Sequence, residues 1–65
     1  MKIKLKDGSV KEYADPKSII EIAADISVGL ARVAMAGEVD GVVEDLRTVL
    51  SEDCELQILT FQDEA

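Results

Sequence analysis

Residues 18–29 read SIIEIAADISVG, and this stretch predicts a short helix with signals at both of its ends. Ser18 and Glu21 have the spacing of a capping box, in which each side chain accepts a hydrogen bond from the backbone N–H of the other residue. Four apolar residues at i, i+3, i+4 and i+7 form one stripe along the helix: Ile19, Ile22, Ala23 and Ile26. We expect Ser27-Val28-Gly29 to stop the helix, with Gly29 suited to a left-handed exit, and a short turn at residues 30–31 to return the chain to a sheet.

A predicted hairpin precedes this helix. Residues 1–6 alternate between apolar and lysine side chains, a pattern typical of a half-buried strand. The pair Asp7-Gly8 predicts a two-residue turn, because glycine adopts positive φ without steric cost. Val10–Tyr13 then forms the returning strand, and Pro16 ends it because proline donates no hydrogen bond to a neighbouring strand.

A second predicted hairpin and a last strand follow the helix. Residues 34–39 form its first strand, Asp40-Gly41 its turn and residues 42–44 its second strand. Residues 46–50 are too few for a full helix and fit a single 3₁₀ turn. Leu56–Phe61 carries apolar residues on both faces, as expected of a central strand. We expect this strand to pair in parallel with the first strand of the chain across a long crossover.

The order strand, strand, helix, strand, strand, strand predicts an α+β fold. The arrangement resembles a β-grasp (ubiquitin-like) module, with a mixed four- to five-stranded sheet covered by one helix. Residues 1–61 form one domain of this kind, and residues 62–65 are an acidic tail or the start of a linker. Met35 is expected in the core. Phe61 is expected there too, or alternatively in a contact with a following domain.

Composition excludes several classes of function. The net charge is −7, with +2 in residues 1–17 (five Lys against three acids) and −9 in residues 18–65 (two Arg against eleven acids). A domain that binds nucleic acid on its own is usually basic, so any RNA contact here would be local. No apolar run approaches the ~20 residues of a membrane span. A chain with this charge is expected to be monomeric.

The reactive side chains indicate no catalytic site. The chain has no His and no glycine-rich phosphate loop, and its one cysteine is Cys54. Asp53 and Glu55 flank this thiol and should raise its pKa, which disfavours a nucleophilic role. A single cysteine forms no internal disulfide, so a cytoplasmic location is expected. We predict no catalytic, cofactor-binding or metal-binding residue, because the acids around the second hairpin lack the spacing of a calcium loop.

Four lysines are the candidate contact residues: Lys2, Lys4 and Lys6 on the first strand, and Lys11 across the hairpin. In one interpretation they form a strip that faces phosphates of an RNA or another partner. In the other interpretation they form a solvated face that protects a sheet edge from aggregation. No stacking aromatic residue accompanies them, which favours the second interpretation.

The ordered segments resemble a TGS domain in the form found in threonyl-tRNA synthetases. Residues 5–9 (LKDGS) resemble the opening of that domain, and residues 22–31 (IAADISVGLA) resemble its helix and exit loop. Residues 36–41 (AGEVDG) resemble its third strand and hairpin, and residues 52–56 and 58–61 its final turn and strand. The chain departs from the family pattern at Asp40, where Asn is usual, and at Val28, where Pro is frequent.

The resemblance implies a non-catalytic N-terminal appendage of a threonyl-tRNA synthetase, the ligase that attaches threonine to tRNA in translation. ATP, Mg and Zn would then belong to other domains of the parent protein. The implied partners are those domains, with tRNA as a further candidate. Two alternatives remain. One is the regulatory or ligand-binding TGS domain of a stringent-response nucleotide synthetase. The other is a free-standing ubiquitin-like module that binds proteins.

Overall fold

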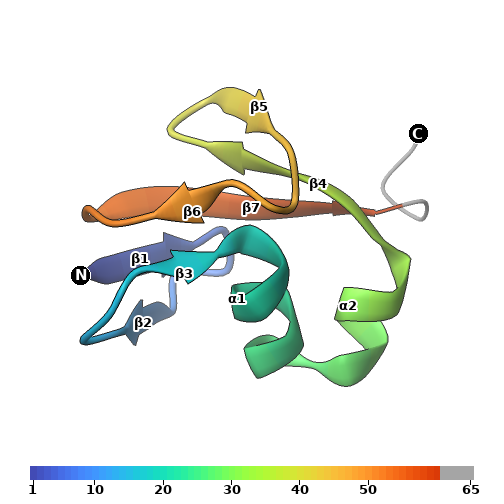
Figure 1. Ribbon diagram of the computed structural model, residues 1–65, viewed down its shortest axis with the longest axis horizontal. Coiled ribbons are helices and arrows are strands. Elements are labelled where there is room, and N and C mark those ends of the chain that lie inside the picture. The colour runs from blue at the N-terminus through green and yellow to red at the C-terminus, as the bar shows by residue number, and fades with distance from the viewer. Residues whose placement is uncertain (61–65) are drawn as a thin grey trace.

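The computed structural model describes residues 1–60. Its strands are β1 (Lys2–Leu5), β2 (Val10–Glu12), β3 (Lys17–Ser18), β4 (Ala34–Val39), β5 (Val42–Glu44), β6 (Val49–Leu50) and β7 (Cys54–Thr60), and its helices are α1 (Ile19–Ile26) and α2 (Val28–Val33). A five-stranded sheet has the order β2-β1-β7-β4-β5, and a two-stranded sheet joins β3 to β6 (Figure 1). The predicted α+β fold with a mixed sheet of up to five strands is confirmed.

Strand β7 lies in the middle of the large sheet. It pairs in parallel with β1, where Leu5 lies opposite Leu56, and antiparallel with β4, where Gly37 lies opposite Ile58. Both the central position of the last strand and its parallel pairing with the first strand are therefore confirmed. The last strand begins two residues earlier than predicted, at Cys54.

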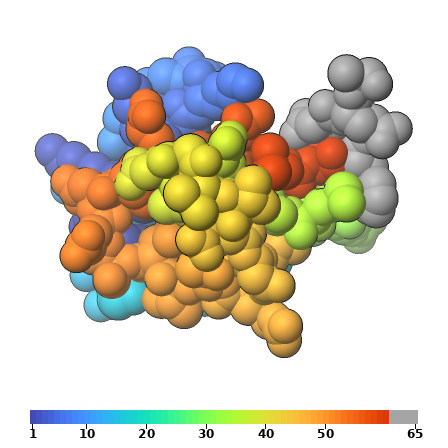
Figure 2. Space-filling model, turned by 90° about the horizontal axis from the view of Figure 1, so that it is seen from above, coloured from blue at the N-terminus to red at the C-terminus, as the bar shows by residue number. Residues whose placement is uncertain are grey.

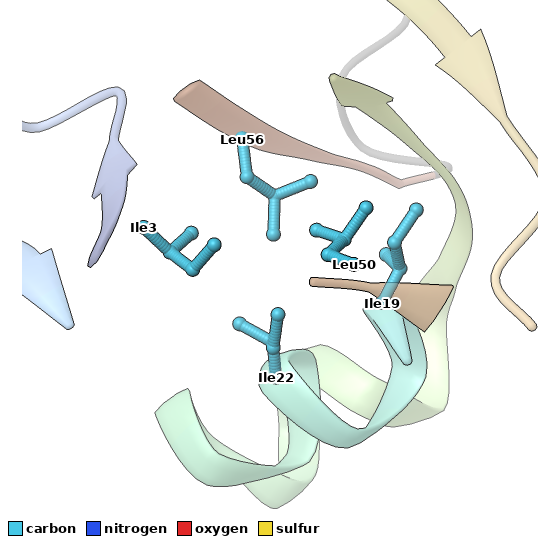
Figure 3. Packing of buried hydrophobic residues seen from close by; sticks show 5 residues of the cluster. All are labelled: Ile3, Ile19, Ile22, Leu50 and Leu56. Carbon is cyan, nitrogen blue, oxygen red and sulfur yellow. The ribbon is translucent and has the colours of Figure 1, made fainter. Parts of the chain in front are cut away.

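The core lies between the large sheet and α1, with β6 closing one side. Five side chains from β1, α1, β6 and β7 point toward one another in Figure 3: Ile3, Ile19, Ile22, Leu50 and Leu56. Each is at most 7% exposed. The predicted apolar stripe is the side of α1 that faces this core. Ala23 is also fully buried, and Ile26 packs against the cluster. Burial of each such side chain favours folding by about 1.5–3 kcal/mol.

The helical region differs from its prediction at one end. The capping box is present: the Ser18 hydroxyl accepts from the backbone N–H of Glu21, and a Glu21 carboxylate oxygen accepts from the backbone N–H of Ser18 at 2.8 Å. The chain does not leave the helix at Gly29. Ser27 ends α1 and also caps α2, because its hydroxyl accepts from the backbone N–H of Leu30. Residues 30–31, predicted as a turn, therefore lie in α2.

The two hairpins use different turns. Asp40 and Gly41 have φ of 48° and 88°, the left-handed pair that a two-residue hairpin turn requires, so this prediction is confirmed. In the first hairpin only Gly8 has positive φ, and the Leu5 N–H donates to the Ser9 carbonyl. The first loop thus has three residues rather than the predicted two, with glycine at its left-handed position.

Three further predictions are wrong in part or in full, or lie outside the described residues. Residues 46–50 are only in part the predicted turn: the Thr48 N–H donates to the Asp45 carbonyl at 2.9 Å and closes a single turn, whereas residues 49–50 form β6, which pairs with β3. Met35 is 54% exposed rather than in the core, because the register of β4 against β7 shifts between Ala34 and Ala36. Phe61 and the tail at residues 62–65 lie outside the described residues.

Candidate contact surface on the open face of the sheet

The helices cover one face of the large sheet, and we call the other the open face. Residues directly opposite one another on paired strands share a face, so the register assigns each side chain to a side. Lys2 lies opposite Glu12, Lys4 opposite Glu55, and Glu38 opposite Gln57. Ile3 and Leu56 point into the core, so their strand neighbours Lys2, Lys4, Glu55 and Gln57 point to the open face.

The open face carries charges of both signs. Its three lysines are Lys2, Lys4 and Lys6, and its three glutamates are Glu12, Glu38 and Glu55. Lys4 Nζ lies 3.9 Å from Glu55 Oε2, in an ion pair whose side chains are 59% and 71% exposed. An exposed pair of this kind contributes little to stability, about 0–1 kcal/mol. Its consequence is electrostatic, because a lysine beside a carboxylate attracts phosphate less than a lysine alone does.

Gln57 connects a lysine to a glutamate across three strands. Oriented as its neighbours require, its side-chain amide donates to Glu38 Oε1 at 3.2 Å and accepts from Lys6 Nζ at 3.3 Å. The amide therefore stands between a cation beside β1 and an anion on β4. Sequence spacing could not reveal this relay, because it depends on the order of the strands in the sheet.

A shallow hollow of about 270 Å³ lies on this face. It is lined by Lys4, Leu5, Lys6, Glu38, Gly41, Glu55, Leu56 and Gln57. Figure 2 shows the atoms of the first hairpin (blue) and of β5 (yellow) on either side of the orange and red atoms of β7. The hollow thus spans β1, β7 and β4, with cations at one side and carboxylates at the centre and the other side.

Lys11 does not join the other three lysines. It lies opposite Ile3, on the helix side of the sheet, and its Nζ lies 3.4 Å from Asp25 Oδ2 on α1. Tyr13 donates from its hydroxyl to the same oxygen at 2.9 Å. Hydrogen bonds from Tyr13 and then Lys11 lower the pKa of Asp25, and desolvation together with Asp25 raises the pKa of Tyr13 to about 12. The four-lysine strip is therefore a three-lysine set, and Lys11 fastens β2 to α1.

Cys54 and two aspartates near it have structural surroundings. Burial is the main cause that raises the pKa of the Cys54 thiol, and the carboxylates of Asp40 and Asp53 raise it further. The predicted upward shift of this pKa is therefore confirmed. Asp40 Oδ1 accepts from the backbone N–H of Glu55 at 2.9 Å, and Asp53 Oδ1 accepts from that of Lys2 at 2.7 Å. The Asp40 carboxylate thus holds the turn between β4 and β5 to β7, and the Asp53 carboxylate holds the start of β1 beside the start of β7. Sequence reasoning did not assign them this role.

Residues 1–60 contain neither a metal-binding cluster nor a membrane-spanning helix. In this part of the chain no three His, Cys, Asp or Glu side chains gather in a way that could hold a metal ion. Among the same residues, neither helix has the length and apolar character needed to cross a membrane. The open face is therefore the surface on which a functional interpretation must be built.

Comparison with known proteins identifies the class of domain. The profile of the TGS domain family matches residues 1–60. The chain is 59% identical over 64 residues to the threonine–tRNA ligase of Acetivibrio thermocellus and 55% identical over 64 residues to that of Desulforamulus reducens, with 98% of the chain covered in each case. It is 46% identical over 61 residues to the threonine–tRNA ligase of Hahella chejuensis, with 94% of the chain covered. The chain spans about a tenth of the length of each of these ligases.

Proposed function

The chain belongs to the TGS domain family, and from this membership we propose that it acts as a non-catalytic N-terminal appendage of a cytoplasmic threonine–tRNA ligase. One observation supports the proposal above all others, namely the 59% identity that extends over 98% of the chain to a ligase of that name. Burial raises the pKa of the single cysteine, Cys54, which disfavours a nucleophilic role. Threonine activation with ATP, and the metals it needs, would belong to the remaining parts of such a ligase.

A domain exchange tests this assignment. Residues 1–60 replace the matching segment of the Acetivibrio thermocellus ligase, and the chimera is assayed for threonylation of tRNA. We expect kcat/KM to stay within about threefold of the parent value, a change of under 1 kcal/mol in transition-state stabilisation. A folded chimera that loses most of its activity would contradict the assignment.

We also propose that the open face contacts a neighbouring protein surface of the ligase, with Lys2, Lys4 and Lys6 among the contact residues. The support is the mixture of charges, since the three lysines share this face with Glu12, Glu38 and Glu55. A surface that binds phosphates carries an excess of lysine or arginine, and its affinity falls steeply with salt. Protein interfaces instead combine charges of both signs at their rims with apolar side chains nearer the centre. Val43 supplies exposed apolar surface here, because it lies opposite Glu38.

The three lysines distinguish a protein contact from a tRNA contact. In the chimera, Lys2, Lys4 and Lys6 are changed together to Ala, and Lys11→Ala, on the other face, serves as the control. A protein contact predicts a lower melting temperature of the chimera with an unchanged KM for tRNA. A KM for tRNA that rises with the triple substitution and depends less on salt would assign the lysines to phosphates instead.

A further inference from the structure

We propose that the hollow on the open face binds a small α-zwitterion, a molecule with an ammonium and a carboxylate group on one carbon. When no ligand is bound, the Gln57 side-chain amide occupies the position of these two charged groups. The inference goes beyond the appendage role, because it assigns a ligand to the isolated domain. A neighbouring ligase surface on this face would compete with the ligand for Lys4 and Lys6, so the test uses the isolated domain.

The relay through Gln57 defines the chemistry. Lys6 Nζ and Glu38 Oε1 each hydrogen-bond to one end of the same amide, at 3.3 Å and 3.2 Å. The amide between these two charged groups therefore presents its oxygen, an acceptor, to Lys6 and its NH₂ group, a donor, to Glu38. An α-zwitterion presents the same pair with full charges, since its carboxylate accepts and its ammonium donates. Both hydrogen bonds would then join groups that are ionised on both sides, which makes them stronger than the bonds to a neutral amide.

The lining also selects the overall charge of the ligand. Two lysines and two glutamates line the hollow, Lys4 and Lys6 against Glu38 and Glu55, so its formal charge is zero. A polyphosphate would meet two carboxylates that repel it, and a polyamine would meet two ammonium groups. A bipolar molecule without net charge satisfies both sides at once.

The size of the hollow limits the ligand to a small molecule. Its volume of about 270 Å³ lies below the ~300–1,000 Å³ of pockets for drug-sized ligands. This is room for a free amino acid with a short side chain once the Gln57 amide swings out.

Titration of the ¹⁵N-labelled chain with glycine, the simplest α-zwitterion, tests the proposal by NMR. We expect the backbone amide signals of Lys6, Glu38 and Gln57 to shift and to saturate in the millimolar range, as expected of a very small ligand on an open surface. Acetate and methylammonium, each carrying one half of glycine, should bind at least about tenfold more weakly, because each makes one of the two charged contacts. No saturable shift with glycine, or pyrophosphate binding more tightly than glycine, would overturn the proposal.

Substitutions separate the site from general charge effects. Lys6→Met and Glu38→Gln should each weaken glycine binding by about fivefold or more, because each removes one charged partner. Gln57→Ala should tighten it, because the competing amide is gone. Lys2→Met and Glu12→Gln, on the same face outside the hollow, are the matched controls and should change nothing. All five positions are outside the buried core, and circular dichroism checks the fold of each variant. Weaker binding in Gln57→Ala, or equal losses in the controls, would refute the site.

Discussion

Gly37 lies on the helix side of β4, where the packing of two core residues leaves no room for a side chain. A Cβ at this position would lie 2.7 Å from Cγ2 and 2.9 Å from Cδ1 of Ile19, and 3.2 Å from Cδ1 of Leu56. Both neighbours are at most 2% exposed and cannot move outward. We therefore predict that Gly37→Ala destabilises the domain by about 1–3 kcal/mol. Urea unfolding measures this as a lower midpoint with an unchanged m value. A variant as stable as the parent would show that the helix and sheet are less tightly packed.

Tyr13 is the one tyrosine, and the chain has no tryptophan, so the absorbance of tyrosinate reports this residue alone. Its folded pKa of about 12 exceeds the ordinary value of 10.0 because of desolvation and the hydrogen bond to Asp25. The unfolded chain therefore loses this proton at lower pH than the folded chain does. The stabilisation is complete below pH 10 and is lost as the pH rises toward about 12.

The prediction is a tyrosinate titration whose midpoint lies well above 10.0 in the folded chain. Asp25→Asn should move the midpoint back toward that ordinary value, because it removes the negative charge beside the hydroxyl. Asp45→Asn, on the loop before β6, is the control and should leave the midpoint unchanged. A folded parent chain that titrates near 10.0 would mean that Tyr13 does not bond to Asp25 in solution.

At the scale of elements, α2 makes the clearest difference between expectation and structure. A left-handed exit at Gly29 would make any other residue there unfavourable, whereas Gly29 lies within α2 and does not have positive φ. The nearest atom to a Cβ at this position is Ser27 Oγ at 3.6 Å, an ordinary contact. Gly29→Ala should therefore stabilise the domain by about 0.5–1 kcal/mol, since alanine is the better helix former. Thermal unfolding tests this prediction, because the melting temperature of Gly29→Ala should be higher than that of the parent chain. A lower melting temperature would favour the left-handed exit.

The elements that could be predicted are those set by local patterns. The capping box at Ser18 and the turn at Asp40-Gly41 depend on residues close in sequence, and both are present. The pairing of β3 with β6 joins residues 17–18 to residues 49–50, so it depends on tertiary contact. In the same region the backbone N–H groups of Ile19 and Ile20 donate to carbonyls of Thr48 and Leu46. The start of α1 is thus held by a segment that sequence periodicity could not connect to it.

The candidate site was only partly predictable for the same reason. Alternation in residues 1–6 placed three lysines on one face of β1, and the register confirms that face for Lys2 and Lys4. The position of Lys11 required the hairpin register, which follows from the length of the first loop. The acids and the amide that accompany the lysines come from β7 and β4, which only the strand order brings beside β1.

For the whole molecule, charge and sheet edges argue for a monomer. The edge strands β2 and β5 have three residues each, too short to template a stable second sheet, and the net charge of −7 opposes self-association. We predict that sedimentation gives the mass of one chain, 7.0 kDa, at micromolar concentration. A dimer that persists at high dilution would contradict this prediction.

We propose that this domain supports a threonine–tRNA ligase without taking part in its chemistry. The most direct test removes the segment matching residues 1–60 from the Acetivibrio thermocellus ligase and measures threonine-dependent exchange of pyrophosphate into ATP. We expect an exchange rate within about threefold of the intact ligase, because no group that activates threonine is removed. A folded, truncated ligase whose exchange rate falls by about a thousandfold, the scale of losing a catalytic group, would contradict it.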